Sequence, residues 1–316
     1  MNNTAKSTIC LFITAIIWGS AFVAQKIGMD SISPFYFSAF RMILGAAALC
    51  VMLLIMNIKN KEDLKKKTEE KKKKERKILL TGGSLCGIVI FFAFNLQQLG
   101  LVSVDAGKTG FITALYIILV PIMGIFLKHR TSLFTWLGAL VGVVGLYFLC
   151  ITEDFSVHPG DMTIMIGAFF WAFHILCIDY FAPKINVLKL NAFQFFVAGF
   201  LSLIIAVIFD DISLPAILTA APAICYTAVF STAIAYSFQA LGQKHLNPTV
   251  ASIILSTEAL FAVVFGGVFL GETLTYREVI GCGLMFTAVI LAQIPPKKRQ
   301  KKIQMNPKLQ NRSKKV

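Results

Sequence analysis

The chain has 316 residues, of which 57% are apolar and 15% are charged, with a mean hydropathy of +0.75 and a net charge of +14. A soluble domain is about half apolar and about a quarter charged, so this composition excludes an ordinary soluble enzyme or binding module. It indicates a protein that crosses the membrane many times.

Ten apolar runs follow one another along the chain. Each can cross a hydrocarbon core of about 30 Å, which takes about 20 helical residues. Most connections are short, so the sequence predicts one all-α, polytopic membrane bundle without a soluble domain. The first run has Trp18 at its centre and no Ala-x-Ala site after it, and is interpreted as a span rather than a signal peptide. The expected spans are 8–28, 35–56, 78–98, 107–127, 133–151, 161–181, 188–209, 219–242, 248–270 and 276–294.

The loops between these runs alternate in charge. By the positive-inside rule the basic loops are cytoplasmic, which predicts that both termini are cytoplasmic too. An even number of spans agrees with this orientation. The basic set is 59–77, Lys128, Arg130, Lys184, Lys189, Lys244 and the tail from Lys297; the acidic set is Asp30, Asp105, Glu153, Asp154, Asp210, Asp211, Glu272 and Glu278.

Two segments account for the net positive charge of the chain. The loop 57–77 holds 11 Lys or Arg against 5 acids, and the tail 295–316 holds 9 Lys or Arg and no acid. Nucleic-acid binding is one interpretation of such runs, but their position beside membrane spans favours anionic lipid headgroups, and no nucleic-acid partner is expected. Glu and Lys spacing predicts that the lysine-rich loop is helical in part.

An internal repeat organises the chain into two halves, 8–151 and 161–294. A shift of 142 aligns Gln97 with Gln239 and Tyr116 with Glu258, and a shift of 153 aligns Trp18 with Trp171 and Arg41 with Gln194. Each half holds five predicted spans, an odd number, so the halves enter the membrane from opposite sides. This predicts two inverted five-helix repeats, with a binding site near the bilayer midplane.

Four stretches carry a family resemblance: "WGSAFVAQK", "SPFYFSAFR", "AGKTGFITALYIILVPIMGIFLKHR" and "EALFAVVFGGVFLGE". They resemble the drug/metabolite transporter superfamily, in its EamA-domain branch, over the whole chain except the basic loop and tail. The resemblance implies two EamA-type repeats and a permease for amino acids, related metabolites or drugs, and it brings no catalytic residue. The chain departs from the family pattern in its long basic loop and in the histidine of "WAFHIL".

Polar and aromatic residues recur at helical spacing along the spans and predict a cavity. Trp18 and Trp171 lie near span midpoints, away from the headgroup zones where membrane tryptophans gather. They either line a cavity or pack the interface between the repeats. The stripes are Thr14, Trp18 and Gln25; Gly167, Trp171 and His174; Thr109, Thr113 and Tyr116; Thr232, Tyr236 and Gln239; and Asn95 with Gln98.

Glu258 is a carboxylate within an apolar run, which costs at least about 2.5 kcal/mol and normally faces a cavity or a paired group. Three roles are open: ligand for a substrate ammonium, proton carrier, or structural partner. Arg41 either snorkels to the outer headgroups or anchors a carboxylate at an outer gate. His174 either titrates during transport or is a packing residue.

The sequence therefore predicts a secondary transporter of the bacterial cell membrane, which moves a small metabolite by alternating access around a midplane cavity. An amino acid or a related compound is expected, with export as the direction. The alternative is a drug or cation efflux permease of the same fold. A channel is disfavoured because inverted repeats around one central polar set suit alternating access better. A membrane-embedded enzyme is disfavoured because no HExxH, GxSxG or paired acidic motif is present.

Cofactors and metals are not expected, since the seven cysteines lie in different apolar segments without ligand spacing. Small-residue patterns at Gly83/Gly87 and Gly138/Gly142 predict close helix contacts, either within the chain or between two copies. The expected state is a monomer or a homodimer.

Overall fold

The computed structural model describes residues 3–59, 68–104, 106–129, 131–150, 159–270 and 275–294. Every regular element in these ranges is a helix. The elements are α1 (Asn3–Met29), α2 (Pro34–Lys59), α4 (Glu69–Ser103), α5 (Ala106–Ala114), α6 (Tyr116–Phe126), α7 (Leu133–Cys150), α8 (Pro159–Phe181), α9 (Val187–Phe209), α10 (Leu214–Tyr226), the π-helical segment η1 (Thr227–Ala235), α11 (Tyr236–Gln243), α12 (Pro248–Leu255), α13 (Glu258–Leu270) and α14 (Tyr276–Ala292).

Eight helical stretches in the described part of the chain are long and apolar enough to cross a membrane. They correspond to eight of the predicted spans. The other two predicted spans, 133–151 and 276–294, coincide with α7 and α14, where the apolar helix is shorter. The all-helical membrane fold is confirmed, and the count of ten spans stays a prediction.

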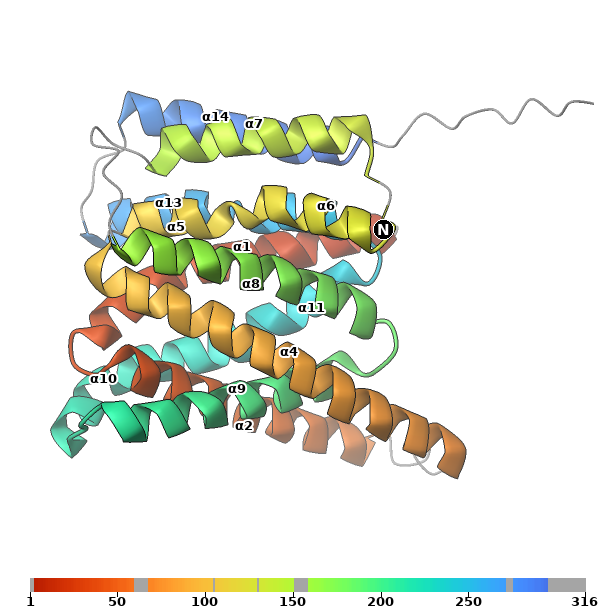
Figure 1. Cartoon of the computed structure of the whole chain (residues 1–316), viewed down its shortest axis with the longest axis vertical. Coiled ribbons are helices and arrows are strands. Elements are labelled where there is room, and N and C mark those ends of the chain that lie inside the picture. Colours follow the sequence, from red (N-terminus) through yellow and green to blue (C-terminus); the bar gives the residue numbers. More distant parts are fainter. Residues whose placement is uncertain are drawn as a thin grey trace, which may run out of the picture.

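The helices lie side by side and share a rough common direction (Figure 1). α1 runs through the middle and contacts α10, η1, α11, α12 and α13. On one side α7 packs along α14, and on the other α4 packs against α8 and α9 while α2 packs against α9. Large apolar side chains such as Leu54, Val207 and Phe126 are exposed on the outside of the bundle, as lipid contact requires.

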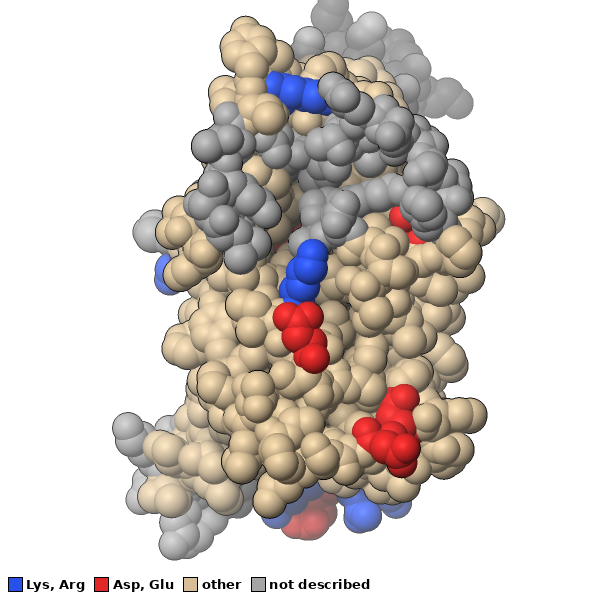
Figure 2. Space-filling view, turned by 90° about the vertical axis from the view of Figure 1, so that its left-hand side faces the viewer, with Lys and Arg blue, Asp and Glu red and all other residues tan. Residues whose placement is uncertain are grey.

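Charge is distributed unevenly between the two ends of the bundle. The N-terminus and the lysine-rich start of α4 lie at the same end in Figure 1. α4 begins at Glu69, so the second part of the lysine-rich loop is helical, with an exposed ion pair between Lys72 and Glu69. Figure 2 faces the opposite end, where the few charged side chains are scattered among uncharged ones.

The predicted glycine contacts are made inside the chain. A Cβ added to Gly138 of α7 would lie 2.8 Å from the carbonyl oxygen of Ala288 on α14. A Cβ on Gly83 of α4 would lie 2.5 Å from the ring of Phe193 on α9. The glycines therefore allow neighbouring helices of one chain to approach closely.

Candidate functional site

A pocket lies within the bundle. Both halves of the chain contribute to it. Its walls combine aromatic rings, neutral polar groups and two charged side chains, and its lining is Trp18, Phe22, Gln25, Arg41, Phe94, Gln97, Thr113, Tyr116, Trp171, Ile175, Ser231, Tyr236, Gln239 and Glu258.

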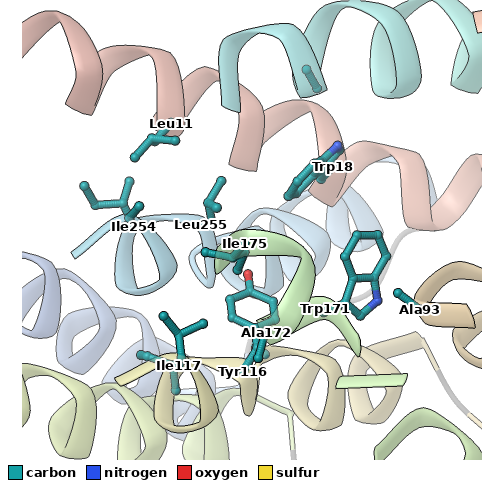
Figure 3. Close-up of a cluster of buried hydrophobic side chains, with 14 of the residues drawn as sticks. Leu11, Trp18, Ala93, Tyr116, Ile117, Trp171, Ala172, Ile175, Ile254 and Leu255 are labelled. Carbon is teal, nitrogen blue, oxygen red and sulfur yellow. The ribbon is translucent and has the colours of Figure 1, made fainter. Parts of the chain in front are cut away.

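The three rings of Trp18, Trp171 and Tyr236 form the aromatic part of this lining. The ring centroid of Trp18 lies 6.3 Å from that of Trp171 and 4.7 Å from that of Tyr236. Figure 3 shows Trp18 and Trp171 reaching the same buried region from α1 and α8. The two tryptophans predicted from their equivalent positions therefore meet, and they both line the pocket and pack against each other.

Two helix interruptions bring polar residues to the pocket. α5 ends at Ala114 and α6 begins at Tyr116, while α12 ends at Leu255 and α13 begins at Glu258. The hydroxyl of Thr257 accounts in part for the second interruption. Its Oγ1 donates at 2.6 Å to the carbonyl oxygen of Ile254, which in a continuous helix would accept a hydrogen bond from a backbone amide.

The two interruptions fall at matching places in the two halves. Tyr116 and Glu258, the first residues of α6 and α13, are 142 positions apart in the sequence. Interrupted helices at membrane depth are tolerated where they are buried in protein or line a cavity.

Glu258 accepts a hydrogen bond from the phenol of Tyr116, with 3.0 Å between the phenol oxygen and Oε1. The carboxyl residue is only 5% exposed. It also lies in the first turn of α13, where the positive end of the helix dipole favours a negative charge. The sequence around Glu258 is apolar and supplies no hydrogen-bond partner. The partner is Tyr116, which holds the equivalent position in the other half.

Arg41 is 1% exposed, so the interpretation that it snorkels to the headgroups is wrong. Its guanidinium donates to Oε1 of Gln25 at 2.9 Å, to Oγ of Ser231 at 2.9 Å and to Oγ1 of Thr232 at 3.1 Å. It also lies over the ring of Phe94, 4.2 Å from the centroid. These neutral partners hold the cation in place, and none of the described carboxylates forms an ion pair with it.

The π-helical segment η1 supplies much of this support. Besides the hydroxyls of Ser231 and Thr232, the carbonyl of Ser231 accepts a hydrogen bond from the indole of Trp18 at 3.2 Å. The hydroxyl of Thr14 donates to the carbonyl of Ala235 at 3.0 Å. π-helical turns frequently mark functional sites, and this one contacts α1 and α2 beside the pocket.

Three of the predicted site residues lie outside the pocket lining. Asn95 is turned toward α9, where its amide donates to the hydroxyl of Ser202 at 2.8 Å. His174 is hydrogen-bonded to Gln194, with 2.9 Å between Nε2 and Oε1. Gln98 is fully buried and has no hydrogen-bond partner among the described residues. The structure therefore brings together Trp18, Arg41, Tyr116, Trp171, Tyr236, Gln239 and Glu258.

Several lining residues were not among the predicted site residues. Gln97 is the clearest case, because it aligns with Gln239 under the shift that pairs Tyr116 with Glu258. Gln25 and Thr113 lie on the predicted polar stripes. Phe22, Phe94 and Ile175 are apolar residues in apolar runs and carry no signal of their own.

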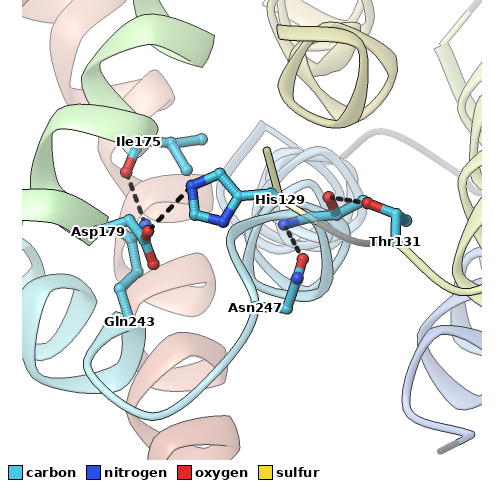
Figure 4. Close-up of polar contacts among 7 residues, drawn as sticks. His129, Thr131, Ile175, Asp179, Gln243 and Asn247 are labelled. Carbon is cyan, nitrogen blue, oxygen red and sulfur yellow. Dashed lines mark hydrogen bonds and ion pairs between the residues drawn. The ribbon is translucent and has the colours of Figure 1, made fainter. Parts of the chain in front are cut away.

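Figure 4 shows polar contacts between the two halves. They follow the C-terminal end of α6, which lies at the same end of the bundle as the N-terminus (Figure 1). Nε2 of His129, just after α6, is 3.6 Å from Oδ2 of Asp179 on α8. Lys128 has φ of 61°, and this turn directs the amide of His129 back to the carbonyl of Gly124 at 2.9 Å. The hydroxyl groups of Thr131 and Thr249 add a second link at 3.3 Å.

The chain matches the model of the EamA-like transporter family twice, over residues 5–151 and 158–293. A protein of Archaeoglobus fulgidus named an uncharacterized transporter is 29% identical, over 90% of this chain and 84% of its own length. The uncharacterized transporter YoaV of Bacillus subtilis is 24% identical over 90% of this chain and 96% of its own. The uncharacterized inner membrane transporter YedA of Escherichia coli is 24% identical over 90% and 89%.

A solved crystal structure shares the fold, with a TM-score of 0.72 at 17% identity over 92% of this chain and 96% of the other. That likeness agrees with the helical bundle described above. Both family matches include residues of the pocket, Trp18 and Tyr116 in the first and Trp171 and Glu258 in the second. The chain belongs to the EamA-like transporter family and is a multi-pass membrane transporter.

Proposed function

We propose that this transporter carries a small zwitterionic metabolite, an amino acid or a close relative, in the pocket between Arg41 and Glu258. The proposal rests on the two charged side chains that line the pocket. One pocket contains a buried guanidinium with neutral partners and a buried carboxylate held by a phenol. A substrate carboxylate at Arg41 and a substrate ammonium at Glu258 would compensate both charges through charge-assisted hydrogen bonds.

Alternating access around this pocket is part of the same proposal, with ten spans arranged as two inverted repeats. The matching interruptions at Tyr116 and Glu258 support it, because broken helices at a repeat interface are typical of such carriers. The contact between His129 and Asp179 would close one end of the pathway and break when that end opens. The basic loop charges support a cytoplasmic position for this end and for both termini, beside anionic lipid.

The alternative is efflux of an organic cation, for which Glu258 and the aromatic walls are suited. Arg41 argues against it, since a buried guanidinium in the same pocket repels a second cation. Export of an amino acid is the direction we propose, from a bacterial cell that holds the protein in its cell membrane.

Reconstitution into proteoliposomes tests the proposed function. Liposomes loaded with unlabelled amino acid should take up labelled amino acid by saturable counterflow, without electrical conductance. Exchange of a lipophilic cation with no exchange of any amino acid would favour the efflux alternative. A steady ionic conductance would contradict a carrier altogether.

A further inference from the structure

Equivalent polar residues of the two halves use their hydrogen-bonding groups differently. The indole N–H of Trp18 donates to the carbonyl of Ser231 at 3.2 Å, whereas that of Trp171 has no hydrogen-bond partner among the described residues. The amide of Gln97 donates to the hydroxyl of Thr113 at 2.9 Å, whereas both amide atoms of Gln239 are without a described partner.

The two unpaired groups are well buried. Trp171 is 7% exposed and Gln239 is 1% exposed. A buried polar group that is left unpaired destabilises a fold, so a fold retains such groups where something else satisfies them. Other unpaired groups in the described chain, such as those of Gln98, do not line the pocket. Trp171 and Gln239 do line it, and a bound solute can therefore reach them.

Tyr236 connects the two residues. Its ring stacks on that of Trp171, with 6.4 Å between centroids and 25° between planes. Gln239 follows Tyr236 by three positions on α11, which places both on one face of that helix. The charged groups of the pocket belong to other helices, Arg41 to α2 and Glu258 to α13.

We propose that Trp171 and Gln239 form a specificity subsite for a neutral hydrogen-bonding group on the substrate side chain, a hydroxyl or a carboxamide. The inference rests on the proposed function, in which Arg41 and Glu258 hold the zwitterionic end. The indole offers a donor, and the glutamine offers a donor and an acceptor. A hydroxyl or a carboxamide both accepts and donates hydrogen bonds, so it pairs with these groups. An alkyl group leaves all of them unpaired, and a carboxylate leaves the acceptor of Gln239 unpaired.

Pairs of amino acids with similar shape, one with a polar and one with an apolar side chain, test this subsite. Affinities for threonine and valine, and for glutamine and methionine, are measured by competition in the counterflow assay. The wild-type protein should bind the polar member of each pair at least tenfold more tightly, because sites built to hydrogen-bond reject analogues that lack the group. Equal affinities within a pair would overturn the subsite.

Variants test whether Trp171 and Gln239 cause the preference for threonine over valine. Trp171→Phe and Gln239→Met should each lower the threonine-to-valine affinity ratio toward one by weakening threonine binding. Trp18→Phe and Gln97→Met are matched controls, whose polar groups already bond within the protein. They should change both affinities alike and keep the ratio. A ratio that falls equally in the controls, or that persists in Trp171→Phe and Gln239→Met, would overturn the assignment.

The same assay separates this inference from the proposed function. If threonine and valine are both exchanged but bind equally, the subsite is wrong and the zwitterion carrier stands. If no amino acid competes, the proposed function is wrong and the subsite is wrong with it. Because each variant serves as its own reference through the ratio, a loss of folded protein does not imitate a loss of preference.

Discussion

At the scale of single residues, the pocket supports two opposite charges in different ways. Glu258 has a phenol donor and a helix N-terminus, while Arg41 has three neutral acceptors and an aromatic face. Neither charge neutralises the other through a described ion pair. This arrangement keeps both groups available to a solute, at the cost of burying them.

Replacing Glu258 by glutamine keeps the shape and removes the charge. Since a hydrogen bond to a charged group contributes about 1.5–3 kcal/mol, Glu258→Gln should weaken binding of a zwitterion by about 10- to 100-fold. Competition for counterflow measures this. Glu69→Gln is the matched control, because Glu69 is an exposed member of the pair with Lys72 and should leave affinity unchanged.

Two other outcomes for this variant have distinct meanings. If Glu258→Gln still exchanges substrate at wild-type affinity but no longer accumulates it against a gradient, the carboxylate carries a coupling proton. Wild-type affinity together with wild-type accumulation would leave Glu258 as a structural partner of Tyr116.

At the scale of elements, the approach of α1 to α13 depends on one glycine. A Cβ on Gly19 would lie 2.5 Å from Cβ of Phe261 and 2.8 Å from the backbone nitrogen of Ala262 and the carbonyl oxygen of Glu258. Backbone atoms cannot yield as a flexible side chain does. Gly19 follows Trp18 directly, so the same contact sets the distance between the aromatic cluster and Glu258.

Gly19→Ala should therefore separate α1 from α13 and lower the free energy of unfolding by about 1–3 kcal/mol, as overpacking does. The thermal midpoint of the purified protein in detergent measures this loss. Gly110→Ala is the control, since its Cβ would make ordinary contact with Ala259 of α13 at 3.8 Å. An equal midpoint in the two variants would show that the tight α1–α13 contact is not required.

The link between α8 and the turn after α6 is a second element-scale feature. Asp179→Asn should weaken the contact with His129 and favour conformations that are open at this end. In a chain whose cysteines are replaced by alanine, a cysteine at Ile175, which lines the pocket, should then react faster with an impermeant thiol reagent from this end. Lys184→Ala is the control, because Lys184 stacks on Tyr180 within the same half. Unchanged reactivity in Asp179→Asn would exclude a closing role.

At the scale of the whole molecule, the sequence predicts the helical bundle well, because apolar runs of membrane length are a strong signal. It also predicts that Trp18 and Trp171 either line a cavity or pack together, because they hold equivalent positions in the two halves. The hydrogen bond between Tyr116 and Glu258 is not predicted, although these two residues also hold equivalent positions. The sequence does not predict that Asn95 and His174 turn away from the pocket, since helix rotation is decided by packing. The π-helical register of η1, which brings Ser231 and Thr232 to Arg41, also leaves no clear pattern in the sequence.

The central claim is that one pocket binds a zwitterion through Arg41 and Glu258. Counterflow of three related solutes tests it most directly: threonine, threoninamide, which keeps the ammonium only, and the corresponding hydroxy acid without the amino group, which keeps the carboxylate only. The account predicts that the wild-type protein exchanges threonine and that each analogue competes at least tenfold more weakly. Competition by threoninamide at the strength of threonine would contradict the claim, because a site that ignores the carboxylate does not use Arg41 as its anchor.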